Sequence, residues 1–428
     1  MAVKFENSRG DLTSYAGLAI AEEIGAKSGL RKALIDHLPM SERKTSLRNK
    51  DFSKALSYVY GFVVGADCIN DLERLYEDCG FRHFCRNHSF TASCLGGFLK
   101  NLSQYNITKI SENLRDFAFR SRLQTVQDRD FIIDIDSTFH EQCAKQMEGL
   151  EYNYENKWGL SSIEAFDQYG FQYFMGVRHG SAFTANGAPG IIRHVFARVP
   201  RTMHRILRAD SGYCNYDVIR ACKDLRVDFV IAARENMYKK YIHRVKTWRK
   251  PKEDIKLRDG RCCEVGSTVY YAKGINQAYR IVFMRARKKQ PSLFEGQYDY
   301  RAFLTSYGEH EKKDWQVILF YRKRGNAENF IKEIKNGYDL HHFPCQRLNA
   351  NKAYGLLAAY AHNIMRVMAH RLDSEQVPYH KRIRFRMICI AGQVVKKARQ
   401  TIIRVRESFR KEVHAWLTMN QNISNGTG

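Results

Sequence analysis

The sequence contains no long apolar run. A membrane-spanning helix needs roughly 18 or more such residues, and the best candidate, residues 355–370, is interrupted by His362, Asn363 and Arg366. The first eleven residues also lack the charged segment followed by an apolar segment that marks a signal peptide. We therefore expect a cytoplasmic protein without a membrane anchor.

Cysteine is present, but in no pattern that indicates disulfides or zinc. The chain has 11 cysteines, an odd number with irregular spacing, which in a long chain without a secretory signal predicts reduced thiols. One cluster has the residue types of a zinc site but lacks the paired C-x2-C spacing, so ordinary buried or surface thiols are favoured. Its members are Cys79, His83, Cys85, His88 and Cys94.

Acidic residues are scarce relative to basic ones. The chain has 45 Asp and Glu against 70 Lys and Arg, a formal net charge of +25, and the excess is spread along the sequence. Because the neutralisation of phosphates releases counterions, this excess of positive charge favours a nucleic acid as partner. An anionic membrane is the competing partner, but no basic amphipathic helix supports it.

Three common catalytic motifs are also missing. The sequence has no G-x4-G-K-[ST] phosphate loop, no G-x-S-x-G elbow and no H-E-x-x-H, so the chemistries that these motifs carry fit less well. What remains is a globular chain of 428 residues with 44% hydrophobic and 12% aromatic content. That length corresponds to about two or three domains.

The N-terminal region, residues 1–125, is expected to be mostly helical. Apolar residues recur every three to four positions over Leu12–Ile24, Phe52–Val63 and Asn101–Phe119, the spacing of one helix face. A helical module of this kind can bind DNA, dimerise, or do both, and the sequence leaves these alternatives open.

The middle of the chain predicts an α/β domain with a mixed sheet. Strands and helices alternate after a strand that begins at Phe131. The further expected elements are strands at Trp158–Phe166, Phe171–Arg178, Arg205–Arg208 and Asp228–Ala233, and helices at Pro189–Ala197 and Asp217–Leu225.

Residues 235–314 predict a β-rich insertion that divides this domain. The segment Lys239–Lys256 is basic and interleaved with aromatic residues, which indicates either a clamp on a nucleic-acid backbone or a solvated charged hairpin. Short strands are expected at Ser267–Ala272, Tyr279–Arg285 and Arg301–Ser306, and the C-terminal region, residues 346–428, is expected to be helical over Gln346–Leu372 and Ile383–Glu407.

Carboxylates follow two of the expected strands. Asp134 and Asp136 end an apolar strand and point to the same side of it, because side chains alternate with a period of two. Asp210 follows the strand that ends at Arg208. Buried carboxylates are costly unless they are paired or hold a cation, although a strand-end turn capped by Asp and Ser is an equal alternative.

A third group of polar residues follows the insertion. Tyr321, Arg324, Glu328 and Lys335 form a Y-x2-R-x3-E-x6-K pattern, in which an expected buried strand, Trp315–Tyr321, precedes an expected helix. Offsets of four and seven place Arg324, Glu328 and Lys335 on one helix face. An adjacent apolar stripe that would seat the helix on a core is formed by Ala327, Ile331 and Ile334.

Asp136, Asp210 and Glu328 lie on separate elements that can converge. Carboxylates are hard oxygen ligands for Mg²⁺ or Mn²⁺, and two such ions about 3.5–4 Å apart can activate a nucleophile and stabilise the leaving oxygen of a phosphodiester. The pattern therefore predicts metal-dependent phosphodiester chemistry, with no nucleophile supplied by the protein.

These residues resemble a known family. Over about residues 50–400 the chain is similar to DDE transposases of bacterial insertion sequences that carry the Y-R-E-K signature. The phrases GADCINDLERLYEDCGF, DIDST, RADSGY and YRKRGNAENFIKEIK are most similar to the insertion-sequence 1380 family, related to the insertion-sequence 4 group. The resemblance implies a ribonuclease-H-like core, residues 126–234 and 315–345, interrupted by the insertion.

The resemblance also implies roles for the candidate residues. Asp136, Asp210 and Glu328 would be the catalytic metal ligands, with two Mg²⁺ or Mn²⁺ ions in each active site. Asp136 is chosen over Asp134 because the family's first Asp precedes Ser/Gly-Thr. The DNA-binding residues would be Tyr321, Arg324 and Lys335, on the phosphates of the transposon end.

The implied function is cutting and joining of DNA at terminal inverted repeats by a homodimer in the bacterial cytoplasm, close to the nucleoid. The partners would be the double-stranded inverted repeats and the target DNA. Two alternatives remain at this point. One is a catalytically silent DNA-binding derivative that acts as a repressor or inhibitor, and the other is a standalone nuclease of the same fold.

Overall fold

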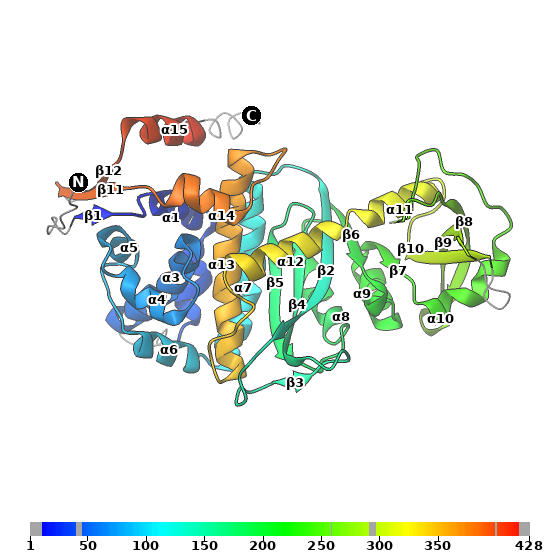
Figure 1. Cartoon of the computed structure of the whole chain (residues 1–428), viewed down its shortest axis with the longest axis horizontal. Helices are drawn as coiled ribbons and strands as arrows, with labels where there is room; N and C mark the ends of the chain where they lie inside the picture. Colours follow the sequence, from blue (N-terminus) through cyan, green and yellow to red (C-terminus); the bar gives the residue numbers. More distant parts are fainter. Residues whose placement is uncertain (1–10, 40–44, 258, 291–296, 399, 419–428) are drawn as a thin grey trace.

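The computed structural model describes residues 11–39, 45–257, 259–290, 297–398 and 400–418. The first ten residues, on which most of the signal-peptide argument rests, lie outside this part. Three regions follow one another along the longest axis of the molecule (Figure 1): a group of N-terminal helices, a central sheet, and the insertion at the far end. Among the described helices, none combines the length and the hydropathy that a membrane span requires.

The central sheet has the strand order β5-β4-β2-β6-β7. Its first three strands pair antiparallel, whereas β6 and β7 run parallel to β2. This mixed order confirms the expected ribonuclease-H-like sheet. The bounds are β2 Asp130–Glu141, β3 Glu151–Tyr152, β4 Trp158–Asp167, β5 Gln172–His179, β6 His204–Ala209 and β7 Asp228–Ala232, with helices α8 Ala188–Phe196 and α9 Tyr216–Leu225 between them.

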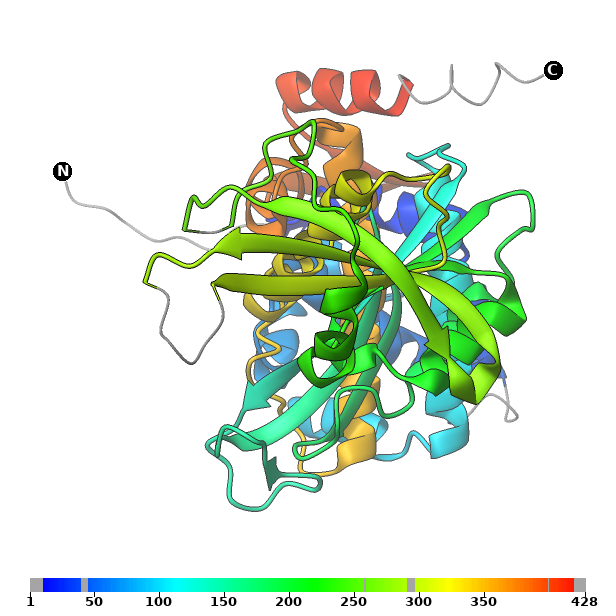
Figure 2. The ribbon, with the colours of Figure 1, turned by 90° about the vertical axis from the view of Figure 1, so that its right-hand side faces the viewer.

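The insertion continues the same sheet. Its strands are β8 Glu264–Ala272, β9 Gln277–Arg287 and β10 Tyr298–Thr305, and β10 pairs antiparallel with β7. The three expected strands are therefore present, each longer than expected. Figure 2 shows them curving across the front of the molecule when it is viewed from the insertion side. The short helix α10, Glu235–Tyr238, precedes them.

The predicted strand Trp315–Tyr321 is wrong, because these residues form helix α11, Asp314–Arg322. Val317 and Ile318 are fully buried against the face of β7, β9 and β10, and the neighbouring apolar side chains are partly covered. A run of seven residues, six of them apolar, fits a buried strand and a buried helix equally well. The helix start is fixed instead by Gln316, whose Oε1 accepts the backbone N–H of Lys313 at 2.8 Å.

The N-terminal region is helical, as expected, and is joined to the sheet by helix α13, Leu348–Leu372. This helix is buried over almost its whole length and packs on α7 and α3 on one side and on β5 on the other. The N-terminal helices are α1 Leu18–Ser28, α2 Leu30–Leu34, α3 Thr45–Val64, α4 Ile69–Leu75, α5 Cys79–Phe84, α6 Ala92–Lys100 and α7 Gln104–Leu123.

The expected helix Ile383–Glu407 is wrong, so the C-terminal region is not helical throughout. After α14, His380–Ile383, and a π-helical turn, the chain forms strands β11, Gly392–Lys397, and β12, Gln400–Arg404. The β-branched residues of the two strands face each other in register, a setting that favours strands over helices. Strand β1, Leu12–Thr13, pairs with β11, and helix α15, Glu407–Thr418, follows.

Candidate active site

Asp136 and Asp210 are neighbours on two central strands of the sheet. The prediction that Asp136 ends its strand is wrong, because β2 continues to Glu141 through its pairing with β4. Strands β2 and β6 pair in parallel with Ile135 opposite Ala209, so the next residue of each chain is one of the two aspartates. Asp136 is 9% exposed, and the Oδ1 atom of Asp210 accepts the backbone N–H of Gly212 at 2.8 Å. Burial raises the pKa of Asp136, and the like charge of Asp210 raises it further. The two carboxylates therefore share one electrostatic environment.

Arg324 links Asp136 to Glu328. Its Nη1 donates to Asp136 Oδ2 at 2.9 Å, and its Nη2 lies 3.5 Å from Glu328 Oε1. Arg324 stands directly before helix α12, Gly325–Gly337, which carries Glu328 in its first turn. The Glu328 side chain is 60% exposed. Arg324 thus contacts two of the three expected carboxylates, and the charge of the third, Asp210, also acts on it.

Tyr321 lies beside this group. It is the penultimate residue of α11, its ring packs on Phe303 with centroids 4.7 Å apart, and the Arg324 guanidinium carbon lies 5.8 Å from its ring centroid. Burial raises the pKa of Tyr321, Arg324 opposes that shift, and the two aspartates add to it. The phenol is therefore close enough to Asp136 and Asp210 for their charges to shift its pKa.

Lys335 is not brought to the carboxylate cluster. Its ammonium donates to the backbone carbonyl of Phe139, on β2, at 2.6 Å. Burial lowers the pKa of Lys335, and the nearby carboxyl of Glu164 opposes the shift. The expected helix face is present, but it lies along β2, so its C-terminal cation faces the inside of the protein.

Glu164 is a buried carboxyl that the sequence analysis missed. It lies on β4 directly opposite Asp136 and is 1% exposed. Ser162 and Gln172 donate to its two oxygens, both at 2.9 Å. Burial nevertheless raises the pKa of Glu164 to about 7, with Asp136 adding to the shift. The available signal was its position in an apolar strand that runs beside Asp136.

The raised pKa of Glu164 predicts a pH-dependent stability. Between its ordinary pKa of 4.5 and its folded value of about 7, the unfolded chain binds fewer protons, so the stability falls as the pH rises through this window. Relative to a Glu164→Gln variant, the parent chain should lose about 3 kcal/mol of unfolding free energy as the pH rises from 4.5 to about 7. Urea unfolding in EDTA at several pH values measures this difference, and parallel curves for the two chains would contradict it.

Asp134 is paired with an arginine of the protein. It is fully buried, and its Oδ1 and Oδ2 accept Nε and Nη2 of Arg208, both at 2.7 Å. Burial raises the pKa of Asp134 to about 6, although Arg208 opposes the shift. Both oxygens are thus engaged by a protein cation. This arrangement favours Asp136 over Asp134 as the ligand of a metal ion.

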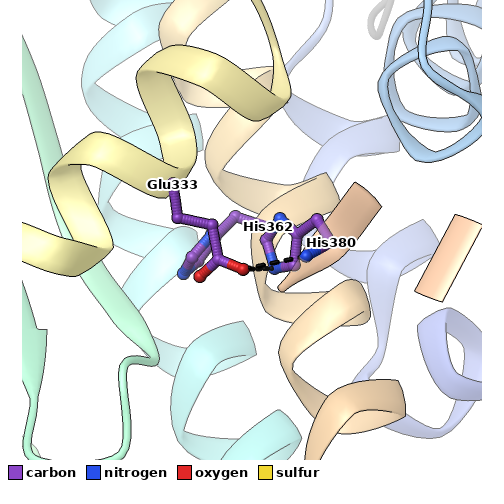
Figure 3. Close-up of side chains that lie close together, drawn as sticks. All are labelled: Glu333, His362 and His380. Atoms are coloured by element: carbon purple, nitrogen blue, oxygen red, sulfur yellow. Dashed lines mark hydrogen bonds and ion pairs between the residues drawn. The ribbon is translucent and has the colours of Figure 1, made fainter. Parts of the chain in front are cut away.

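A second buried cluster holds the far half of α12 in place. Glu333 of α12, His362 of α13 and His380 of α14 face one another (Figure 3), with ligand atoms within 4.8 Å. Glu333 Oε1 accepts the backbone N–H of His380 at 2.9 Å, and its Oε2 lies 3.4 Å from Arg366. These contacts tie α12 to the two C-terminal helices.

The same three residue types can bind zinc, but the surrounding charges argue against a metal ion here. Glu333 is already paired with Arg366, and the positive charges of Arg366 and Arg384 both lower the pKa of His380, after burial and His362. A divalent cation would add two more positive charges to this buried site, where such repulsion is weakly screened. We therefore assign the cluster as an anchor of α12.

Within the described part of the chain, this anchor is the one group of His, Cys, Asp and Glu ligand atoms tight enough to suggest a metal ion. The Cys79–Cys94 cluster is not among them, and its three cysteines are free thiols. Asp136, Asp210 and Glu328 are more widely spaced, with Arg324 between two of them. Their donor atoms are nevertheless the oxygens that Mg²⁺ and Mn²⁺ prefer.

A ribonuclease-H-like sheet that carries one carboxylate within β2 and another directly after β6 defines a class of metal-dependent nucleic-acid enzymes. The family model for the transposase DDE domain, group 1, matches residues 1–423. The chain therefore belongs to this family of DDE transposases, enzymes of DNA cleavage and strand transfer.

Among solved structures, the chain is similar to a piggyBac transposase synaptic complex with hairpin DNA, determined by cryo-electron microscopy. The TM-score is 0.45 and the sequence identity is 12%, over 87% of this chain and 79% of that chain. No curated protein sequence matches this chain.

Proposed function

We propose that the protein is the transposase of a bacterial insertion sequence of the 1380 type, and that it cuts and joins DNA at terminal inverted repeats. The observation that carries the proposal is the adjacency of Asp136, within β2, and Asp210, directly after β6, with Arg324 joining Asp136 to Glu328. Carboxylates and one arginine in this arrangement suit both metal ions and a phosphate backbone.

In this proposal Asp136, Asp210 and Glu328 hold Mg²⁺ or Mn²⁺. When bound, two such ions activate the attacking water or 3′-hydroxyl and stabilise the leaving oxygen. Asp136 stands within β2 and Asp210 directly follows β6, so the parallel pairing of these strands sets their spacing. Glu328 is largely exposed on the first turn of a helix, and its side chain is free to turn toward them.

Arg324 and Tyr321 are proposed to bind phosphates of the transposon end. The Arg324 guanidinium compensates the charge of Asp136 and can exchange this carboxylate for a phosphate group, since both present two oxygens to its fork of donors. Lys335 would have to leave the carbonyl of Phe139 to reach a phosphate. In its present position it holds α12 against β2.

The DNA itself is proposed to lie across the insertion and the catalytic edge. In the segment Lys239–Lys256 the aromatic side chains face inward: Tyr241 is buried and Trp248 packs on Tyr300 with centroids 5.9 Å apart. Many of the cations are exposed, as a phosphate clamp requires. The exposed ones include Lys239, Lys240, Arg244, Lys246, Arg249 and Lys250.

The direct test is a strand-transfer assay with the full chain, DNA that carries the inverted repeats of the element, and Mg²⁺. The proposal expects both cleaved ends and products joined to a target duplex. Cleaved ends without any joined product would support the standalone nuclease instead. A chain that binds the ends but leaves them intact would support the silent derivative.

The salt dependence of binding is a further expectation. A chain of net charge +25 should lose about 10³-fold or more in DNA affinity between about 50 and 200 mM salt. Replacing Lys246, Arg249 and Lys250 with glutamine should reduce the slope of log K against log salt by about one for each phosphate that is no longer bound. Fluorescence anisotropy at several salt concentrations measures both, and a flat dependence of the parent chain would contradict the proposed partner.

A further inference from the structure

Arg208 is a fully buried cation whose three nitrogen atoms all reach oxygen acceptors. Nε and Nη2 donate to the two carboxylate oxygens of Asp134, both at 2.7 Å, and Nη1 donates to the backbone carbonyl of Phe320 at 2.9 Å. The guanidinium carbon also lies 5.1 Å from the ring centroid of Phe320. One side chain thus contacts strand β2 and helix α11 while it stands on strand β6.

These contacts lie two residues before the candidate active-site aspartates along β2 and β6. Asp134 and Arg208 are opposite each other in the parallel register of β2 and β6. Since side chains alternate with a period of two, the next residues on the same face are Asp136 and Asp210. Phe320 directly precedes Tyr321. Arg208 therefore binds together the three elements that carry residues of the site.

We propose that Arg208 is a positioning residue of the active site. Its hydrogen bonds to Asp134 and to the Phe320 carbonyl fix the positions of Asp136, Asp210 and the α11–α12 junction relative to one another. This inference rests on the proposed function, because it assigns the geometry that the proposed metal ligands need.

The energetics of buried ion pairs support a role in geometry over a role in stability. Taking two charges out of water costs about as much as their attraction returns, so an apolar pair of similar volume is often as stable or more stable. An apolar pair lacks directional hydrogen bonds. Arginine offers donors in a planar fork, which lysine cannot reproduce.

The same sheet provides a matched control. Arg122 and Asp167 form another pair with fully buried side chains, with Nε and Oδ2 3.3 Å apart. Asp167 lies opposite Ile133 on β2, one residue out of phase with Asp134, and therefore on the other face of the sheet. Arg122 stands on α7, and a variant of it measures what the loss of a buried ion pair does to the fold without changing the contacts of Asp134.

The test uses the full chain and Mn²⁺ as the probe, with binding followed by the rise in melting temperature and by the free-Mn²⁺ signal in electron paramagnetic resonance. The variants are Arg208→Lys, the double variant Arg208→Met/Asp134→Leu, and Arg122→Lys as the control. Asp136→Asn reports on the proposed site itself. Cleavage of inverted-repeat DNA is measured alongside.

We expect the double variant to melt at or above the temperature of the parent chain, yet to need about 10- to 100-fold more Mn²⁺ and to lose cleavage. Arg208→Lys should show the same weakening of Mn²⁺ binding, whereas Arg122→Lys should keep the affinity of the parent. If Asp136→Asn abolishes Mn²⁺ binding but the Arg208 variants bind as the parent does, the inference alone is overturned. If Asp136→Asn binds Mn²⁺ unchanged, the proposed function fails, and the inference fails with it.

Discussion

Replacing any one of the three carboxylates with its amide is expected to abolish strand cleavage while DNA binding persists. Asp136→Asn, Asp210→Asn and Glu328→Gln keep the shape of each side chain but remove the charge that a metal ligand needs. The transition-state charge held by such an ion is worth several kcal/mol, and each 1.36 kcal/mol is a factor of ten. Each variant should therefore cleave about 10³-fold more slowly or worse.

The measurement is a gel assay of end cleavage beside a binding assay with the same DNA. Asp217→Asn is a matched control, because Asp217 is exposed in the first turn of α9, seven residues from Asp210. It should cleave as the parent does. If one of the three amide variants keeps the parent rate, that residue is not a metal ligand. Weak DNA binding by all three would instead indicate a damaged fold.

The largest expected loss of stability follows from Glu333→Ala. This carboxylate is 7% exposed and compensates Arg366 while it caps the backbone of His380. Removing one partner of a buried pair leaves the other charge uncompensated, which costs about 3–5 kcal/mol. Urea unfolding should therefore show a loss of that size, with the slope of the transition unchanged.

Glu23→Ala provides the comparison, since Glu23 pairs with Lys27 on an exposed helix face at 2.6 Å. Such surface pairs contribute about 0.5 kcal/mol or less, so this variant should be almost as stable as the parent. A chelator separates the anchor from a metal site at the same residues. If EDTA lowers the melting temperature of the parent chain but not that of the Glu333 variant, the assignment as an anchor is wrong.

Much of the central sheet could be predicted because its signals are local. Apolar runs followed by aspartate marked β2 and β6, although β2 runs on to Glu141, and the parallel register of the two strands places Asp136 beside Asp210. The helix spacing around Glu328 predicted α12, including its buried stripe of Ala327, Ile331 and Ile334. In these cases the residues that define the element also define its buried face.

The errors and omissions share a different cause, which is contact with residues far away in sequence. Trp315–Tyr321 was ambiguous until its partner, the sheet face of the insertion, was known. Glu164 became visible only through the register of β4 against β2. Arg208 looked like an ordinary charge at a strand end, although its acceptors, Asp134 and Phe320, are 74 and 112 positions away.

The junction between α11 and α12 has a mechanical consequence. α11 rests on the strands of the insertion, α12 runs on along β2 to the anchor at Glu333 (Figure 1), and the break between them falls at Lys323 and Arg324. The insertion is joined to the core both by this junction and by the pairing of β10 with β7. Because both ion pairs of Arg324 start at the junction, a small rotation there would change both distances at once.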